Sequence, residues 1–302
     1  MDTREWALLI FTILGQTAAG TFLVLLIVRT FIKSKAGVEQ ADKLTTFPLY
    51  IVVPVMALAL LSSLFHLGSP LNIIKAVPNL TSSWLSREVV ISVVFTVLAV
   101  LYTFMYWRKI GSEQAKTILG WITALVGIFQ VYGMAMVYMI RTQPAWNTLA
   151  TPVSFFTTAL LLGVLTVAAG LIVSYSRLGK APAQQTELLR GVLQGLALAS
   201  IILLGIEFLV LPLYMAYLSS LGSAAVQTLN LMMGSFGSTL ALRLILVFIG
   251  AGLLAAYLYR NASIPGKEST FSTLIYSALA LVLVSEVMGR FIFYATHVNI
   301  GL

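Results

Sequence analysis

The sequence predicts an all-α, polytopic membrane protein: a bundle of eight transmembrane helices with both termini on the outer, periplasmic side. Of its 302 residues, 59% are apolar and only 9% are charged, whereas about a quarter of a soluble domain is charged. Eight apolar stretches each reach the roughly 20 residues needed to cross about 30 Å of hydrocarbon. The basic residues gather in alternate loops, as expected for a chain that crosses a membrane repeatedly.

The predicted spans are separated by short connections. They are residues 5–31, 46–68, 86–107, 117–140, 153–175, 190–218, 237–259 and 271–297. Each is too long and too evenly apolar for a tilted barrel strand, and in lipid every backbone polar group must be bonded internally. We therefore expect helices throughout.

Local signals mark the ends of several spans. The first follows "MDTREW", whose mixed charges and lack of a small-residue cleavage site argue against a signal peptide. The second ends at "HLGSP", because Gly68 and Pro70 stop a helix. The third opens with "SWLSREV", and "WNTLATPVSFF" leads into the fifth. Pro54 in the second span and Pro212 in the sixth are candidate breaks.

Tryptophans and glycines support this division of the sequence. All five tryptophans fall near predicted helix ends, where an amphipathic ring prefers the headgroup zone. Several glycines are expected to let helices approach closely, namely Gly15, Gly20, Gly127, Gly133, Gly163 and Gly170. The longest connections, 69–85 and 219–236, are under about 20 residues, which leaves no room for a separate soluble domain. Residues 1–302 are therefore predicted to form one membrane domain.

The distribution of arginine and lysine orients the bundle. Twelve of the 18 basic residues lie in or beside the loops that follow the first, third, fifth and seventh spans. By the positive-inside rule these loops face the cytoplasm, so both termini are expected outside. The formal net charge of +8 is then mostly a topology signal, and it gives no reason to expect a nucleic-acid partner.

The cysteine and histidine counts restrict the cofactors. The sequence has no cysteine, so it offers no cysteine ligands for an iron–sulfur cluster and forms no disulfide. Its two histidines are too few for the two bis-histidine haems of a cytochrome b anchor. A single haem between His66 and His297 remains an alternative. We expect neither haem nor another metal in this protein.

Polar residues inside the spans carry the functional signal, because an ionisable group in a bilayer is costly unless it is paired or wetted. The predicted topology places ten of them in the outer half of the bundle: Gln16, His66, Arg87, Glu88, Glu207, Arg243, Glu286, Arg290, Tyr294 and His297. The inner halves are expected to lack such groups. A site open to the external surface is therefore predicted in the outer half.

The last span concentrates these residues. Glu286, Arg290, Phe293, Tyr294 and His297 fall at i, i+4, i+7, i+8 and i+11, which is one stripe facing the bundle. The spacing allows an ion pair between Glu286 and Arg290. Such a pair would either fix helix packing or take part in proton relay.

Five segments carry a resemblance to a known family. They are "FTILGQTAAG", "FHLGSP", "SWLSREV", "WNTLATPVSFFTTALLLG" and "SEVMGRFIFYATHVNIG". In their order over nearly the whole sequence they resemble the membrane-anchor subunit of dimethyl sulfoxide reductase. The resemblance implies a haem-free, eight-helix subunit of the bacterial or archaeal inner membrane. Such a subunit oxidises menaquinol and passes electrons to an iron–sulfur subunit with four-iron clusters, which feeds a molybdopterin-containing catalytic subunit.

The resemblance also assigns a role to His66, because the histidine of the HLGSP element is tied to quinol binding in that family. Quinol oxidation releases two electrons and two protons, and imidazole is a suitable acceptor near neutral pH. We expect Glu88, Glu207 or Glu286 to relay the proton, and Arg87, Arg243 or Arg290 to polarise the ring oxygens or hold carboxylates ionised. The protein itself has no catalytic cofactor, so it would act as a quinol-oxidising subunit rather than as an enzyme alone.

Two other functions remain open. A quinone-linked anchor of the polysulfide reductase type would share most of these features. A secondary transporter would also need intramembrane charges, but transporters place them near the midplane and commonly show broken helices and an inverted repeat. Here the charged residues gather toward one end of the helices, which favours the quinol anchor.

Overall fold

The structure is a computed structural model. It describes residues 3–67, 79–178, 183–262 and 268–300, without the side chains of residues 3–4, 66–67, 183–184 and 268–269. The predicted quinol ligand His66 therefore has a described backbone, at the end of a helix, and a side chain outside the described part. Gly68 and Pro70, the predicted stop signals, also lie outside it.

The described residues are all-α, in agreement with the predicted fold class. The helices are α1 (Thr3–Leu67), α3 (Trp84–Trp107), α4 (Glu113–Tyr138), α5 (Ala150–Arg177), α6 (Ala183–Ser220), α7 (Ser223–Met233), α8 (Gly237–Val247), the π-helical segment η2 (Phe248–Leu254), α9 (Ala255–Asn261) and α10 (Glu268–Ala295). Within the described ranges, seven helices are long and apolar enough to cross a membrane. The protein is thus a multi-pass membrane protein.

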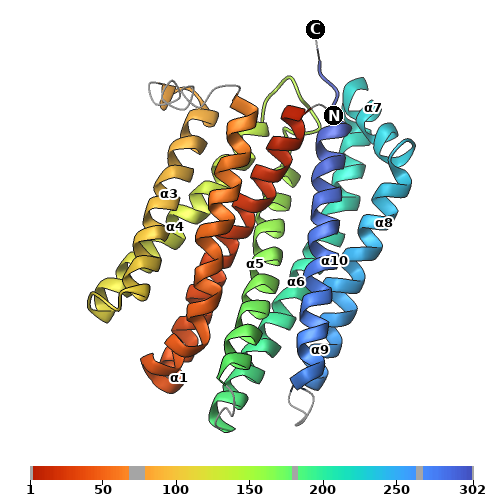
Figure 1. Ribbon diagram of the computed structural model, residues 1–302. Helices are drawn as coiled ribbons and strands as arrows, with labels where there is room; N and C mark the ends of the chain where they lie inside the picture. Colours follow the sequence, from red (N-terminus) through yellow and green to blue (C-terminus); the bar gives the residue numbers. More distant parts are fainter. Residues whose placement is uncertain (1–2, 68–78, 179–182, 263–267, 301–302) are drawn as a thin grey trace.

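The first of these seven helices accounts for two of the predicted spans. Helix α1 bends at Gly37, whose φ of 84° lies in the left-handed region that glycine enters at little cost. The chain then returns toward the end where it began (Figure 1). With two crossings in α1, the described helices make the eight predicted passes, and the described ends of α1 and α10 lie at the same end of the bundle (Figure 1).

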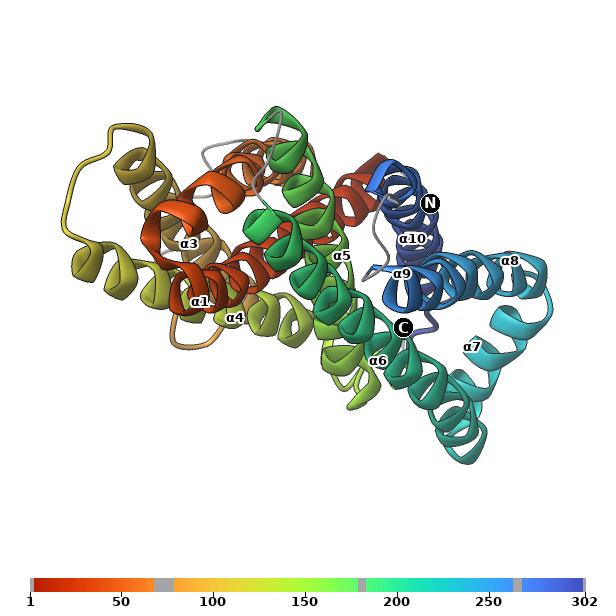
Figure 2. The same ribbon diagram turned by 90° about the horizontal axis from the view of Figure 1, so that it is seen from below.

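Helix α5 lies at the centre of the bundle (Figures 1 and 2). Most of its residues are buried, including a nearly continuous run from 157 to 172. Helices α1 and α4 pack on one side of it, and α6 and α10 on the other. Helices α8, η2 and α9 together form the seventh span and pack against α10 and α6. The main core therefore runs through the bundle, with α5 between its two sides.

Two glycines bring α1 and α5 into backbone contact. A Cβ atom added to Gly20 would lie 1.8 Å from the carbonyl oxygen of Ala159, and one added to Gly163 would lie 2.4 Å from the carbonyl carbon of Gly20. Close approach of this kind is how small residues stabilise helix pairs in a membrane, because packing replaces the hydrophobic driving force. The expectation of close approach is confirmed at both positions.

The end of the bundle where α1 begins and α10 ends differs from the prediction in two places. The connection 219–236 contains α7, an 11-residue helix too short to span. Its buried residues include Ala225 and Met232, which pack in a small second core with Leu240 and Ile292. Helix α10 ends at Ala295 rather than at His297, which follows in irregular structure. A length rule identifies spans, but it cannot detect a short helix that covers their ends.

The expectation that the span halves predicted to face inward lack ionisable groups does not hold for Arg29, which lies near the second end of the predicted span 5–31. Arg29 in the first half of α1 is 6% exposed and pairs with Asp42 in the second half at 2.5 Å. The two residues are far more than one helical turn apart in sequence, and the reversal at Gly37 brings them together. Arg29 therefore belongs to a polar group at the end of the bundle opposite the termini, and not to a solvated loop.

Candidate functional site

The predicted polar stripe of α10 lies inside the bundle. Glu286, Arg290 and Tyr294 are 3%, 5% and 3% exposed. Each ion pair or hydrogen bond matters here, because a buried charge without partners costs several kcal/mol. The partners of these three residues therefore define the site.

Glu286 and Arg290 do not pair with each other, in contrast to the prediction. Glu286 accepts a hydrogen bond from the Thr158 hydroxyl of α5 at 2.5 Å. Arg290 donates to the amide oxygen of Gln16 on α1 at 3.1 Å, and its guanidinium lies 3.6 Å from the centre of the Phe155 ring. Since α10 lies between several helices, side chains one turn apart find different partners. The i, i+4 spacing permits a pair but does not select it.

The ion-pair partner of Glu286 comes from α8. Arg243 lies 3.7 Å from a carboxylate oxygen of Glu286 and also forms a very short contact with Glu207 of α6. Gly289 makes room for this arginine, because a Cβ atom there would lie 2.3 Å from the Arg243 Nε. One guanidinium between two carboxylates leaves one negative charge in excess when both are ionised, and a proton would remove it. Such an arrangement is suited to holding and releasing a proton.

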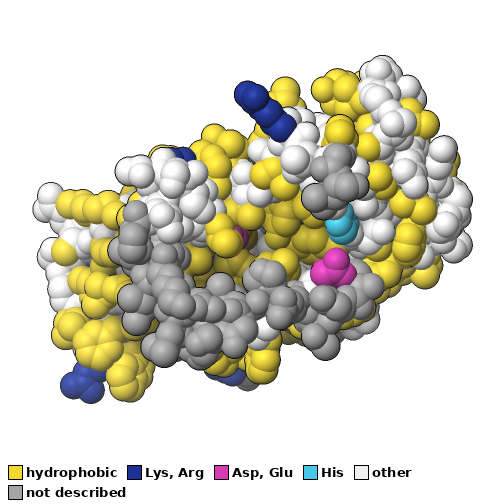
Figure 3. Space-filling model, turned by 90° about the horizontal axis from the view of Figure 1, so that it is seen from above, with side chains coloured by type: hydrophobic (Ala, Val, Ile, Leu, Met, Phe, Trp, Pro, Cys, Tyr) yellow, Lys and Arg dark blue, Asp and Glu magenta, His cyan; other side chains and the backbone are white. Residues whose placement is uncertain are grey.

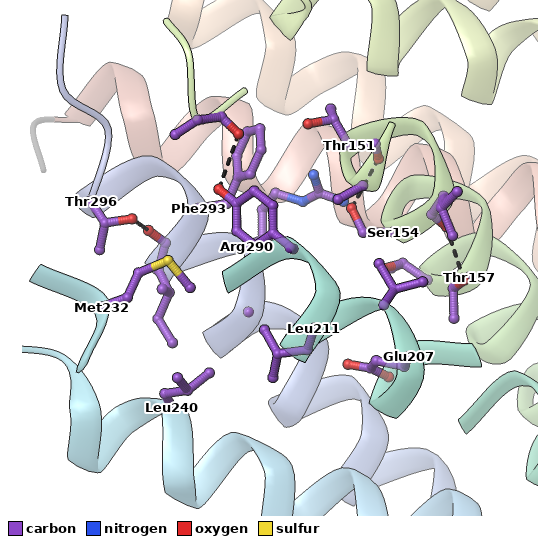
Figure 4. A pocket seen from close by; sticks show the side chains of 18 of the residues that line it. Thr151, Ser154, Thr157, Glu207, Leu211, Met232, Leu240, Arg290, Phe293 and Thr296 are labelled. Carbon is purple, nitrogen blue, oxygen red and sulfur yellow. Dashed lines mark hydrogen bonds between the residues drawn. The ribbon is translucent and has the colours of Figure 1, made fainter. Parts of the chain in front are cut away.

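A cavity of about 120 Å³ lies beside these groups, between α5, α6, α7, α8 and α10. Figure 4 shows Thr151, Ser154 and Thr157 of α5 on one wall, with Glu207 and Arg290 among the other lining residues. Each of these three hydroxyls donates to a backbone carbonyl, so what remains free on their oxygens is acceptor capacity. The rest of the lining is mostly apolar, and the space holds several water molecules or part of a larger ligand.

A second buried polar group lies nearer the start of α3 and the ends of α4 and α10. The hydroxyls of Tyr138 and Tyr294 are 2.6 Å apart. Glu88 is 5% exposed and forms no ion pair with any described residue. It lies on α3 against α4, where a Cβ atom added to Gly133 would lie 3.6 Å from the Glu88 Cα. Aromatic rings of Trp146 and Phe293 pack around Tyr138. A buried carboxyl group without an ion-pair partner among the described residues, on a helix that packs against the one carrying Tyr138, is a candidate proton acceptor.

Two predicted site residues lie away from these groups. Arg87 donates to the backbone oxygens of Leu80 and Thr81, both at 2.7 Å, and stacks on Trp84. It therefore holds the segment before α3 rather than facing the interior. The His297 ring packs against Trp146 at a tilt of 30°, with its Nδ1 2.5 Å from the Tyr294 carbonyl oxygen, at the margin of the aromatic group.

Residues that the sequence reasoning missed complete both groups. Thr158 donates a hydrogen bond to Glu286, and Gly289 leaves space for Arg243. The Tyr138 hydroxyl forms a hydrogen bond with that of Tyr294. The sequence pattern that points to these residues is weak. Gly289 stands directly before Arg290, and Thr158 belongs to the sequence "FFTTALLLG". Threonine and tyrosine are so common in membrane helices that neither would be selected from the sequence.

We expect the Arg243 network to respond as a unit to mutation. Arg243→Gln leaves two buried carboxyl groups without a counter-charge and should lower the free energy of unfolding by about 3 kcal/mol or more. Adding Glu286→Gln should recover part of that loss. The measurement is a double-mutant cycle on thermal unfolding of the purified protein. Strictly additive effects would show that the two side chains are not coupled.

The fold and site define a polytopic, helix-bundle membrane protein with a buried ionisable site near one end. The protein belongs to the family described as DMSO reductase anchor subunit (DmsC), whose family model matches residues 1–296. It is 28% identical over 308 residues to the Escherichia coli (strain K12) protein named as the YnfH chain of anaerobic dimethyl sulfoxide reductase, covering 99% of this sequence and 97% of the relative.

Two further relatives are similar to this protein over nearly its whole length. The protein is 26% identical over 300 residues to the C chain of anaerobic dimethyl sulfoxide reductase from Escherichia coli (strain K12), covering 99% of this sequence and 97% of the relative. It is 27% identical over 303 residues to the protein of the same name from Haemophilus influenzae, covering 99% and 96%. The resemblance found in the sequence is confirmed.

Proposed function

We propose that this protein anchors an anaerobic, molybdopterin-containing reductase in the inner membrane, oxidises menaquinol, and passes the electrons to an iron–sulfur subunit. Family membership supports the role of anchor, and the names of the relatives support a reductase of the dimethyl sulfoxide type. The sequence has no cysteine, so the four-iron clusters that receive the electrons belong to the partner.

The observation that carries the proposal is the buried group of Glu88, Tyr138 and Tyr294. Quinol oxidation needs a proton acceptor beside the quinol hydroxyl, in a setting that is apolar enough to admit the ring. Glu88 is buried without a described cation, and aromatic side chains surround the two phenols. A carboxyl group already paired with an arginine would be a poorer acceptor, because the cation favours its ionised form and opposes protonation.

His66 is proposed as the first acceptor of the quinol proton. The end of α1 that carries it and the start of α3 that carries Glu88 lie at the same end of the bundle (Figure 1). A histidine at a helix end can exchange its proton with water, while a buried carboxyl group can hold the second proton. Arg290, fixed by Gln16 and by the Phe155 ring, supplies positive charge between the two polar groups.

Glu286 and Glu207 are proposed as a proton relay that leads away from the quinol ring. Both flank Arg243, and the cavity beside them has room for water. Glu286→Gln should keep the complex assembled while slowing quinol oxidation. Arg243→Gln added to it should not restore the rate, because the relay needs the carboxyl group itself.

The electrons are proposed to leave at the end of the bundle where the termini lie. Seen from this end, the described surface carries few charged side chains and is hollowed between apolar ones (Figure 3). The iron–sulfur subunit would dock here, within reach of the quinol ring, and connect this protein to the molybdopterin subunit. The lipid bilayer supplies the menaquinol, and no haem takes part.

Purification tests the proposal. The tagged protein from an anaerobically grown host should retain an iron–sulfur subunit and a molybdopterin subunit, and the complex should reduce its acceptor with menaquinol as donor. The iron–sulfur and molybdenum content is measured on the same sample as the rate. A protein that purifies alone, or a complex that is inert toward every quinol, would refute the proposed role.

A further inference from the structure

A second cavity lies at the end of the bundle opposite the termini. It measures about 350 Å³ and lies between α1, α3 and α4. Its polar lining consists of Arg29, Thr30, Lys33, Ser34, Thr117 and the two tyrosines Tyr102 and Tyr106. None of its described lining residues is acidic. The quinol site uses none of these residues.

The charged side chains around the cavity do not balance. Arg29 pairs with Asp42 at 2.5 Å, and Lys116 pairs with Glu113 at 3.0 Å. Lys33 lies 3.6 Å from the same Glu113, which is already engaged. Three cations, Arg29, Lys33 and Lys116, thus share two carboxylates, and one positive charge is left over beside the cavity.

Lys33 is the least tightly held of the three cations and the one most available to a ligand. Arg29 is buried by its contacts with Asp42, Thr45 and the Tyr106 ring, whereas the side chain of Lys33 is 35% exposed. Its two polar contacts, to Glu113 at 3.6 Å and to the Thr117 hydroxyl at 3.5 Å, are both long. A lysine ammonium has three donors, and an anion could satisfy them better than these contacts do.

The surroundings of the cavity are amphipathic. On α1, Ile27, Thr30 and Ser34 fall at i, i+3 and i+7, so an exposed apolar side chain continues directly into the hydroxyl-lined part. On α4, Thr117 and Trp121 are one turn apart, and the exposed tryptophan is of the type found at the membrane interface. A ligand with a charged head and apolar chains would contact both parts.

We propose that this cavity binds the phosphate of an anionic phospholipid. The phosphate oxygens accept hydrogen bonds from Lys33 and neutralise the excess charge, and the acyl chains lie along Ile27 and Trp121. Basic pockets between transmembrane helices suit such headgroups. The basic side chains bind the phosphate, while the acyl chains stay in contact with the apolar helix surface and the bilayer. The bound lipid would join the α1 hairpin to α3 and α4.

Lipid retention by the purified complex tests this proposal. The complex is stripped of lipid, moved into phosphatidylcholine nanodiscs, and titrated with phosphatidylglycerol, and bound lipid is counted by native mass spectrometry. Wild type should retain phosphatidylglycerol in preference to phosphatidylcholine. Lys33→Ala should weaken this binding roughly fivefold, from the typical attraction of one lysine to anionic lipid. Lys33→Arg should bind nearly as wild type.

Lys35→Ala is the matched control, because Lys35 is an exposed lysine two residues away that does not line the cavity. It should bind as wild type. Equal loss in Lys35→Ala would mean a diffuse surface effect and would overturn the proposal. Equal retention of both lipids by the wild-type protein would also overturn it, and this outcome does not depend on whether any variant folds. Inorganic phosphate displacing the lipid completely would assign the cavity to the free ion instead.

Discussion

Replacing His66 with alanine is expected to abolish menaquinol-driven turnover while the complex remains assembled. A positioned general base typically contributes 10²- to 10⁴-fold to a rate, so the loss should be about 100-fold or more. Activity driven by a reduced dye that feeds electrons directly to the soluble subunits should stay at the wild-type level. The comparison of the two rates on one preparation separates quinol chemistry from stability.

Ser62→Ala provides the matched control for His66. Ser62 lies one turn earlier on the same face of α1, and its hydroxyl donates to the Ala59 carbonyl oxygen at 2.7 Å. Since that bond is local, its removal should leave the quinol-driven rate close to wild type. A His66→Ala variant that oxidises menaquinol normally would remove His66 from the site, and equal losses in both variants would point to the helix end rather than to the imidazole.

Replacing Gly20 with leucine is expected to prevent stable folding of the anchor. Even the Cβ atom would lie 1.8 Å from a backbone oxygen of α5, which no side-chain rearrangement can avoid. Overpacking typically costs about 1 to 3 kcal/mol when side chains can adjust, and separation of two backbones should cost more. The expected result is loss of the protein from the membrane fraction, measured by its abundance and by its melting temperature in detergent.

Gly191→Ala controls for the loss of glycine itself. Gly191 lies within α6, and a Cβ atom added there meets no atom within 4 Å. Alanine should therefore be neutral or stabilise by up to about 1 kcal/mol through helix propensity. If Gly20→Leu accumulated and melted like this control, α1 and α5 could not be packed as closely as described.

Much of the architecture could be predicted from the sequence because hydropathy and length act locally. Patterns within single helices predict the eight passes and the interior stripe of α10. They also predict that α1 begins and α10 ends at the same end of the bundle. Helix α7 was missed because 11 residues give no membrane signal. Two predicted spans in the first 68 residues require the chain to reverse between them, and Gly37 sets where it does so.

The pairing of polar groups could not be predicted in the same way. Glu286 pairs with Arg243 rather than Arg290 because α8 approaches α10 at Gly289, a contact between distant segments. The pair of Arg29 and Asp42 depends on the hairpin in α1. Depth along a helix identifies which residues are unusual, but their partners are set by packing between helices. The residues of the site could thus be predicted from the sequence, but the ion pairs and hydrogen bonds between them could not.

We propose that the outer half of this protein binds the quinol ring, and photo-crosslinking is the sharpest test of this site. A menaquinone analogue with a photoreactive group on its ring is bound to the assembled complex, irradiated, and its adducts are located by peptide mass spectrometry with excess menaquinone as competitor. We predict competed labelling in the outer parts of α1, α3 and α10, near His66, Glu88 and Tyr294. Competed labelling confined to the inner half of the bundle, or to the partner subunits, would show that the ring binds elsewhere.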